Sequence, residues 1–192
     1  VVKETAPGAW VRQCGRVVPF SARFADRKGL LLDGLSHRFR RRAAALGLPE
    51  PAETEDSFVG NARIKAHAAA RASQMIALAD DSGISVDALG GAPGIHTADW
   101  AETSEGRDFR MAMEKTWGML ERGKAPLPRR AQFRATLVRA HPDGRDRVCE
   151  GVVHGQVVWP TRGAMGHGYD PMFQPEGYDI TFAEMEPTTK NR

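Results

Sequence analysis

The stretch Ile76-Ala-Leu-Ala-Asp80-Asp81-Ser82-Gly83 is the part of the sequence from which the fold can be worked out. Its four apolar residues predict a short buried strand, and the Asp-Asp-Ser-Gly that follows is typical of a turn at the strand's end. Ligands bind beyond the carboxyl ends of strands in open α/β sheets, so we expect the functional site here. Two neighbouring carboxylates favour a divalent cation, and oxygen ligands favour Mg²⁺. An ordinary Asp-rich turn is the alternative.

The sequence before this strand predicts a helix. Asp56 or Ser57 can cap it, and it runs to about Ala72. Asn61 and Lys65 are four residues apart and therefore share one face of the helix. Because the helix leads directly into the strand, it could bring Lys65 close to the acidic pair. A solvated lysine on the helix surface is the alternative.

The sequence after the strand predicts a further extended segment, a turn-rich loop and a second helix. Ile84–Val86 is extended, and Asp87–Gly94 is dense in glycine and proline. Ser104 can cap the second helix, and Gly123 can end it. Its apolar residues recur at spacings of four, four and three, at Phe109, Met113, Trp117 and Leu120.

The last third of the chain combines a hairpin with a glycine-rich loop. Gln132–Ala140 and Arg147–Val153 predict an antiparallel β-hairpin. Arg162–Pro171 contains three glycines that let the backbone approach a ligand closely, although a surface loop without a ligand has the same composition. Thr181–Met185 is expected to start a helix that leads to Lys190.

Composition favours one domain and excludes several classes of protein. The chain has 192 residues, of which 41% are hydrophobic and 27% charged, as in an ordinary globular domain. The net charge of +3 is local to a few arginines between Arg38 and Arg42, whereas a nucleic-acid-binding protein shows a basic face. Cys14 and Cys149 form neither a disulfide framework nor a zinc motif. No run approaches the roughly 20 apolar residues of a membrane span, so we expect a cytoplasmic protein.

Several separate stretches match one family pattern. They are Ser57-Phe58 with Asn61-Ala62 and Lys65-Ala66, then Leu78 to Gly83, Val86 to Gly94, Glu150-Gly151, Gly166 to Pro171 and Thr181 to Glu184. With these motifs in order over about Leu46 to Arg192, the chain resembles the inosine/xanthosine triphosphate pyrophosphatase family.

The resemblance implies an α/β fold in which helices flank an elongated, mixed central β-sheet, with two lobes and a nucleotide cleft between them. It also implies a homodimer. The activity it implies is Mg²⁺-dependent hydrolysis of non-standard purine nucleoside triphosphates, namely dITP, ITP and XTP. The products would be the nucleoside monophosphate and pyrophosphate.

The resemblance further implies a role for each matched residue. Asp81 matches the catalytic acidic residue and a metal ligand, Glu53 matches a second Mg²⁺ ligand, and Asp80 supports them. The other matched positions contact the triphosphate or the purine, and they are Asn61, Lys65, Ser82, His167, Gly168, Tyr169, Asp170 and Lys190. Donors such as Lys190 suit a 6-keto purine, because the amino group of adenine would leave buried polar groups unpaired.

The chain also departs from the family pattern. The family's Ser/Thr-x-Asn-x-x-Lys phosphate loop does not occur between Val1 and Leu46, and the chain stops at Arg192, where family members continue. His167 stands where phenylalanine is usual, and Gly60 where glutamate is common. We therefore predict an atypical N-terminal segment over residues 1–42 and a C-terminally truncated pyrophosphatase domain over residues 43–192.

These departures leave two alternative functions open. One is a catalytically impaired relative that binds purine nucleotide or only folds. The other is a broader nucleotide phosphohydrolase. The products of the reaction separate these two alternatives from the pyrophosphatase. A pyrophosphatase releases pyrophosphate, a broader phosphohydrolase releases phosphate, and an impaired relative releases neither.

Overall fold

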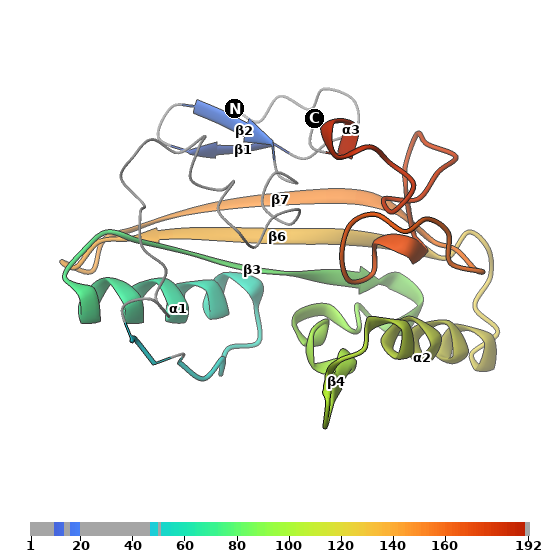
Figure 1. The fold of residues 1–192 in the computed structure, drawn as a ribbon, viewed down its shortest axis with the longest axis horizontal. Helices are drawn as coiled ribbons and strands as arrows, with labels where there is room; N and C mark the ends of the chain where they lie inside the picture. Colours follow the sequence, from blue (N-terminus) through green and yellow to red (C-terminus); the bar gives the residue numbers. More distant parts are fainter. Residues whose placement is uncertain (1–9, 14–15, 20–46, 50, 191–192) are drawn as a thin grey trace.

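The computed structural model describes residues 10–13, 16–19, 47–49 and 51–190 (Figure 1). Most of the predicted atypical segment, residues 1–42, lies outside these ranges. Within it, β1 (Trp10–Gln13) and β2 (Arg16–Pro19) pair as an antiparallel ribbon, and β1 contacts β7 of the central sheet. The predicted boundary between residues 42 and 43 stays a prediction.

A long antiparallel sheet forms the centre of the molecule (Figure 1). Its strands, in spatial order, are β3 (Ala77–Val86), β6 (Arg130–Ala140), β7 (Asp146–Val157) and β8 (Phe173–Pro175). Strands β6 and β7 are the predicted hairpin, which is therefore confirmed and longer than the alternation alone indicated. An elongated central sheet flanked by helices is also confirmed, but the strand pairs of this sheet among the described residues are all antiparallel and not mixed as expected.

Two helices lie toward opposite ends of the sheet (Figure 1). They are α1 (Phe58–Ser73) and α2 (Phe109–Arg122). The remaining elements are short: β4 (Glu102–Thr103), β5 (Gly106–Arg107), α3 (Pro187–Lys190) and the 3₁₀ turns η4 (Asp87–Leu89), η5 (Gly94–His96), η6 (Asp99–Ala101) and η7 (Asp170–Met172). No helix in the described part of the chain is long and apolar enough to cross a membrane.

The buried apolar side chains form two main clusters. The first, here called the α1 cluster, joins small residues of α1 to Val138 and Ala140 of β6, with Ala77 and Ala79 packed against it. The second, the α2 cluster, joins α2 and the C-terminal elements to the far half of β3, through Ile84 and Val86. Strand β3 therefore contributes to both.

The structure corrects the predicted strand boundary at Asp80. Strand β3 continues without a turn through Asp80, Asp81, Ser82 and Gly83, paired with β6 from Ala77 opposite Ala140 to Val86 opposite Ala131. Local turn preference is overridden because ten residues of pairing satisfy the backbone of this segment. The acidic pair therefore lies in the middle of an antiparallel strand, and not at the carboxyl end of a parallel one.

Gly83 occupies a strand interior because another segment approaches it closely. A Cβ at Gly83 would lie 2.4 Å from the carbonyl oxygen of Gly94 and 2.4 Å from Oγ1 of Thr97. That threonine hydroxyl accepts a hydrogen bond from the backbone N–H of Ile84 at 3.0 Å. Glycine in a strand commonly marks such an approach.

Gly83→Ala is expected to lower the free energy of unfolding by about 1–3 kcal/mol, because the added methyl group overpacks a site bounded by backbone. Urea denaturation measures this loss. Gly118→Ala is the matched control, because the nearest atom to its added Cβ is the flexible end of Arg122, at 3.2 Å. Equal stability of Gly83→Ala and the parent protein would contradict the close approach.

The helix ends confirm two predictions and correct two. Ser57 caps α1, since its Oγ accepts from the N–H of Gly60 at 3.1 Å. Helix α2 ends at Gly123, as predicted. Its N-cap is Asp108, whose Oδ1 accepts hydrogen bonds from two backbone N–H groups. Ser104, the predicted cap, lies in the turn between β4 and β5. The helix expected from Thr181 begins only at Pro187.

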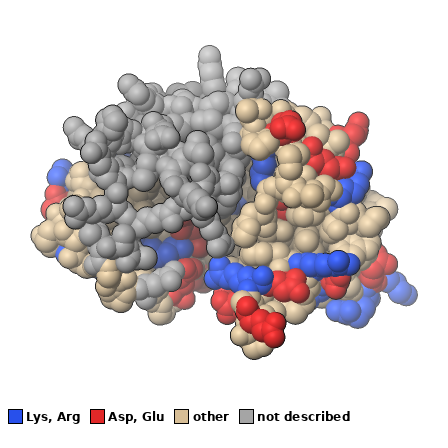
Figure 2. All heavy atoms as spheres, viewed as in Figure 1, with Lys and Arg blue, Asp and Glu red and all other residues tan. Residues whose placement is uncertain are grey.

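The reason for the late start of α3 is Pro187. The backbone N–H of Thr181 donates to Oε2 of Glu184 at 2.8 Å in a single turn. A helix continuing from that turn would need a backbone N–H at Pro187, which proline lacks, and proline suits the first position of a helix, so α3 begins there. On the face of the molecule shown in Figure 2, acidic and basic side chains are interspersed over the described residues.

Candidate functional site

The first group of predicted residues lies between α1 and β3. Nζ of Lys65 is 3.1 Å from Oδ1 of Asp81 and 3.1 Å from Oε1 of Glu53. Asp81 is 8% exposed, and the Lys65 side chain is largely buried. The structure therefore brings the predicted catalytic carboxylate, the predicted second metal ligand and the predicted phosphate lysine together.

Strand geometry separates Asp81 from its neighbours in sequence. Successive side chains of a strand point to opposite faces, so Asp80 and Ser82 lie on the face opposite to Asp81. Asp80 is exposed. The structure thus does not bring these two predicted residues onto the side where Glu53 and Lys65 meet Asp81.

Burial and charge act in opposite directions on Asp81. Burial raises the pKa of its carboxyl to about 6, although the Lys65 ammonium lowers it, and the charges of Glu53 and Asp80 raise it further. Burial alone would lower the pKa of Lys65, but its two carboxylate partners outweigh this effect and raise it. Lys65 is therefore a cation at neutral pH, between two carboxylates that compete for it.

The pH dependence of stability is expected to report Asp81. Its folded pKa of about 6 lies above the ordinary 3.8, so its favourable contribution is present below about pH 4 and is lost as the pH rises through 6. Asp81→Asn removes this loss. Without metal, the free energy of unfolding of the variant minus that of the parent should increase by roughly 1–2 kcal/mol from pH 4 to pH 7. Urea denaturation in EDTA measures this difference, and a constant value would contradict the burial argument.

The donor atoms at Asp81 fit a divalent cation. Its Oδ2 is buried without a hydrogen-bond partner, while its Oδ1 accepts from Lys65. Among the described residues, no group of three or more His, Cys, Asp or Glu side chains could hold a metal alone. Magnesium needs no such group, because it is commonly held by one or two carboxylates together with substrate phosphates and water. Asp81 and Glu53 could supply those two carboxylates.

Asn61 lies beside this group and is 2% exposed. Its Oδ1 accepts a hydrogen bond from the backbone N–H of Glu55 at 3.0 Å. Glu55 was not among the predicted residues, and its part in the site could not be found from the sequence, because the contact uses its backbone.

The second group of predicted residues lies in the glycine-rich loop. Asp170 is 4% exposed, accepts from the backbone N–H of His167 at 2.7 Å and forms an ion pair with Lys190. The Lys190 ammonium also lies 4.9 Å from the centre of the Phe182 ring. Asp170 therefore fixes both the loop backbone and the predicted base-recognising lysine.

The aromatic residues of this loop differ in exposure. The Tyr169 ring is 1% exposed within the α2 cluster, and burial raises the pKa of its phenol to about 12. His167 is exposed, and its ring meets the edge of Phe109 at 4.9 Å between centroids. Gly168 has φ +65° and lies next to the same phenylalanine. The predicted purine contacts of all three residues stay predictions.

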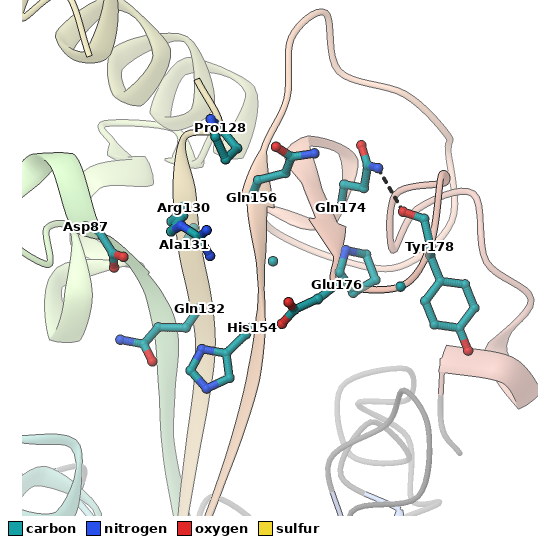
Figure 3. Close-up of a pocket in the computed structure, with 13 residues that line it drawn as sticks. Asp87, Pro128, Arg130, Ala131, Gln132, His154, Gln156, Gln174, Glu176 and Tyr178 are labelled. Carbon is teal, nitrogen blue, oxygen red and sulfur yellow. Dashed lines mark hydrogen bonds between the residues drawn. The ribbon is translucent and has the colours of Figure 1, made fainter. Parts of the chain in front are cut away.

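A separate pocket of about 450 Å³ lies farther along the sheet (Figure 3). Side chains from β6, β7 and the segment after β8 line it, including Arg130, Gln132, His154 and Glu176. It contains none of the predicted site residues. The candidate site is therefore defined by the two groups around Asp81 and Asp170, and not by this pocket.

Comparison with known proteins gives a consistent result. The model of the Ham1 family matches residues 20–192. A protein of Ruegeria pomeroyi named dITP/XTP pyrophosphatase is 67% identical over 150 residues, which cover 78% of this chain and 74% of that protein. A Caulobacter vibrioides protein of the same name is 53% identical over 162 residues, covering 84% and 80%.

Solved structures agree with the sequence relatives. A HAM1 protein from Coxiella burnetii superimposes with a TM-score of 0.76 at 30% identity and covers 87% of each chain. The Staphylococcus aureus Ham1 protein gives a TM-score of 0.69 at 32% identity, covering 77% of this chain and 74% of that one. The resemblance indicated by the motifs is confirmed, and the chain belongs to the Ham1 family.

Proposed function

We propose that this chain is a nucleoside triphosphate pyrophosphatase that hydrolyses dITP, ITP and XTP to the monophosphate and pyrophosphate. The observation that carries the proposal is the meeting of Asp81, Lys65 and Glu53, in which one buried carboxylate oxygen has no partner. The names of the relatives, dITP/XTP pyrophosphatases, support the substrate class.

In the proposed mechanism each residue near Asp81 has a separate role. Asp81 and Glu53 would hold Mg²⁺, which when bound neutralises phosphate oxygens and polarises the bond to be broken. The Asp81 carboxylate orients water for attack on the α-phosphate and accepts its proton. Lys65 turns from the carboxylates toward the leaving pyrophosphate and stabilises its developing charge. Asp80, on the other face, acts only through its charge.

Base selection is proposed to reside in the glycine-rich loop. Lys190, oriented by Asp170, donates a hydrogen bond to the 6-keto oxygen of hypoxanthine or xanthine. Adenine offers an amino group there, so two donors would face each other and remain unpaired, which discriminates by 10⁴-fold or so in sites built on hydrogen bonds. His167 and the backbone of Gly168 would line the purine.

The test measures products with matched substrates. In the presence of Mg²⁺ the chain is expected to release pyrophosphate from dITP and XTP, with kcat/KM at least about a hundredfold above that for ATP or dATP. Ion chromatography separates pyrophosphate from phosphate. Phosphate as the product would favour the broader phosphohydrolase, and no release above buffer would favour the impaired relative.

The proposal also includes a cytoplasmic homodimer. It is supported by the family resemblance and not by any contact within this single chain. Light scattering should give about twice the 21.0 kDa chain mass. A mass of one chain at micromolar concentration would remove the dimer from the proposal and leave the chemistry untouched.

A further inference from the structure

Glu53 stands in a segment without regular secondary structure, and few contacts hold it. Residues 51–57 precede α1 and are mostly exposed. The Glu53 side chain pairs with Lys65, but that ammonium also pairs with Asp81. If Lys65 turns to a phosphate, the ion pair is lost just when Glu53 is needed as a ligand. Contacts that do not use Lys65 must then hold the segment.

Asn61 provides one such contact. Its side chain is buried in the first turns of α1 and reaches back six residues, where its Oδ1 accepts from the N–H of Glu55 at 3.0 Å. This bond fixes the backbone two residues from Glu53. The bond uses only the oxygen of Asn61, because phosphate oxygens accept hydrogen bonds and would be met by the amide NH₂ of this side chain instead.

Gly60 allows the second contact, the packing of Glu55 against the helix, because it has no side chain. A Cβ at this position would lie 2.4 Å from Cβ and 2.7 Å from Cγ of Glu55, closer than such atoms approach in proteins. The first turn of α1 contains no acidic residue of its own. The Glu55 side chain fills this space beside the helix N-terminus, where a negative charge is stabilised.

We propose that Asn61 and Gly60 are positioning residues that hold segment 51–57 against α1, so that Glu53 stays in place for the cation when Lys65 is engaged elsewhere. In this role Asn61 acts through the N–H of Glu55. The inference rests on the proposed function for its purpose, but the contact itself belongs to the metal-free protein.

The experiment compares four variants by two measurements that need no turnover. Hydrogen exchange of the Glu55 amide is followed in metal-free protein, and Mn²⁺ affinity is followed by electron paramagnetic resonance. Asn61→Ala should speed exchange at least tenfold and weaken Mn²⁺ binding about tenfold, as expected when a residue supporting a ligand is lost. Asn61→Asp keeps the accepting oxygen and should restore slow exchange. Gly60→Ala should weaken Mn²⁺ binding although alanine favours a helix.

Gly118→Ala is the matched control, because it makes the same change in α2 away from this segment, and both readouts should match the parent. In turnover assays, Asn61→Ala should raise the Mg²⁺ concentration for half-maximal rate more than it lowers kcat. Unchanged Glu55 exchange in Asn61→Ala, or a raised KM for dITP with unchanged metal affinity, would overturn the inference. If the parent protein releases no pyrophosphate, the proposed function is wrong. The hydrogen-exchange and Mn²⁺ results would still test the positioning role of Asn61 and Gly60.

Discussion

Asp81→Asn is expected to lower kcat/KM for pyrophosphate release from dITP by about 10²- to 10⁴-fold. Asparagine keeps the size of the side chain and can still meet Lys65, but it neither accepts a proton nor neutralises a cation. The buried Oδ2 that has no partner in the described structure is the atom whose chemistry is lost. Steady-state assays of pyrophosphate release at several Mg²⁺ concentrations measure the change.

Two further carboxylates serve as comparisons for Asp81. Asp87→Asn makes the same chemical change at an exposed position after β3 and should retain the parent rate. Asp80→Asn should lose less than about tenfold, because its carboxylate lies on the other face of the strand and acts on Asp81 through its charge. If kcat/KM falls as much in Asp80→Asn as in Asp81→Asn, the placement of these two carboxylates on opposite faces of β3 does not explain the activity.

Lys65→Met is expected to give the second large effect, both on rate and on stability. The rate should fall by roughly 10²- to 10³-fold, because a cation at the leaving group is removed. Without metal, Glu53 and Asp81 then face each other with no charge between them. Because Glu53 is partly exposed, the free energy of unfolding should fall by about 1–3 kcal/mol, less than for a fully buried pair.

Magnesium should reverse part of this loss of stability. A divalent cation between the two carboxylates replaces the missing ammonium, so Mg²⁺ should raise the Tm of Lys65→Met more than that of the parent. Lys115→Met is the control, since Lys115 lies on α2 over the Trp100 ring, far in sequence from the carboxylates. Equal shifts in all three proteins on adding Mg²⁺ would show that Glu53 and Asp81 do not share a cation site.

Local signals predicted α1 and the β6–β7 hairpin well, because their information is contained within each segment. Ser57 followed by an alanine-rich run is sufficient for a capped helix. Strand β3 was divided wrongly because its continuity depends on pairing with β6, about fifty residues away. Neither Asp80-Asp81-Ser82-Gly83 nor its neighbours contain that information, so their turn preference was the stronger local signal.

The predicted site residues also depend on tertiary contacts that a local stretch of sequence does not contain. Lys65 could be placed near Asp81 because a helix that leads into the next strand packs beside it. The separation of Asp80 and Ser82 from Asp81 follows from the alternation of a strand, which a predicted turn does not have. Tyr169 was matched to a purine-contacting position, which stays a prediction, and the burial of its ring in the α2 cluster could not be predicted from the sequence. Burial of a side chain in a loop depends on the tertiary fold.

Because β3 contributes to both clusters, both of them hold the strand that carries Asp81. Ala77 and Ala79, on the same face of β3 as Asp81, pack against the α1 cluster, and Ile84 and Val86, on the opposite face, belong to the α2 cluster. A substitution in either cluster that tilts one half of β3 moves the carboxylate relative to Glu53 and Lys65. The position of this one carboxylate therefore limits which substitutions the two clusters tolerate. Core substitutions too mild to unfold the chain should already lower its activity.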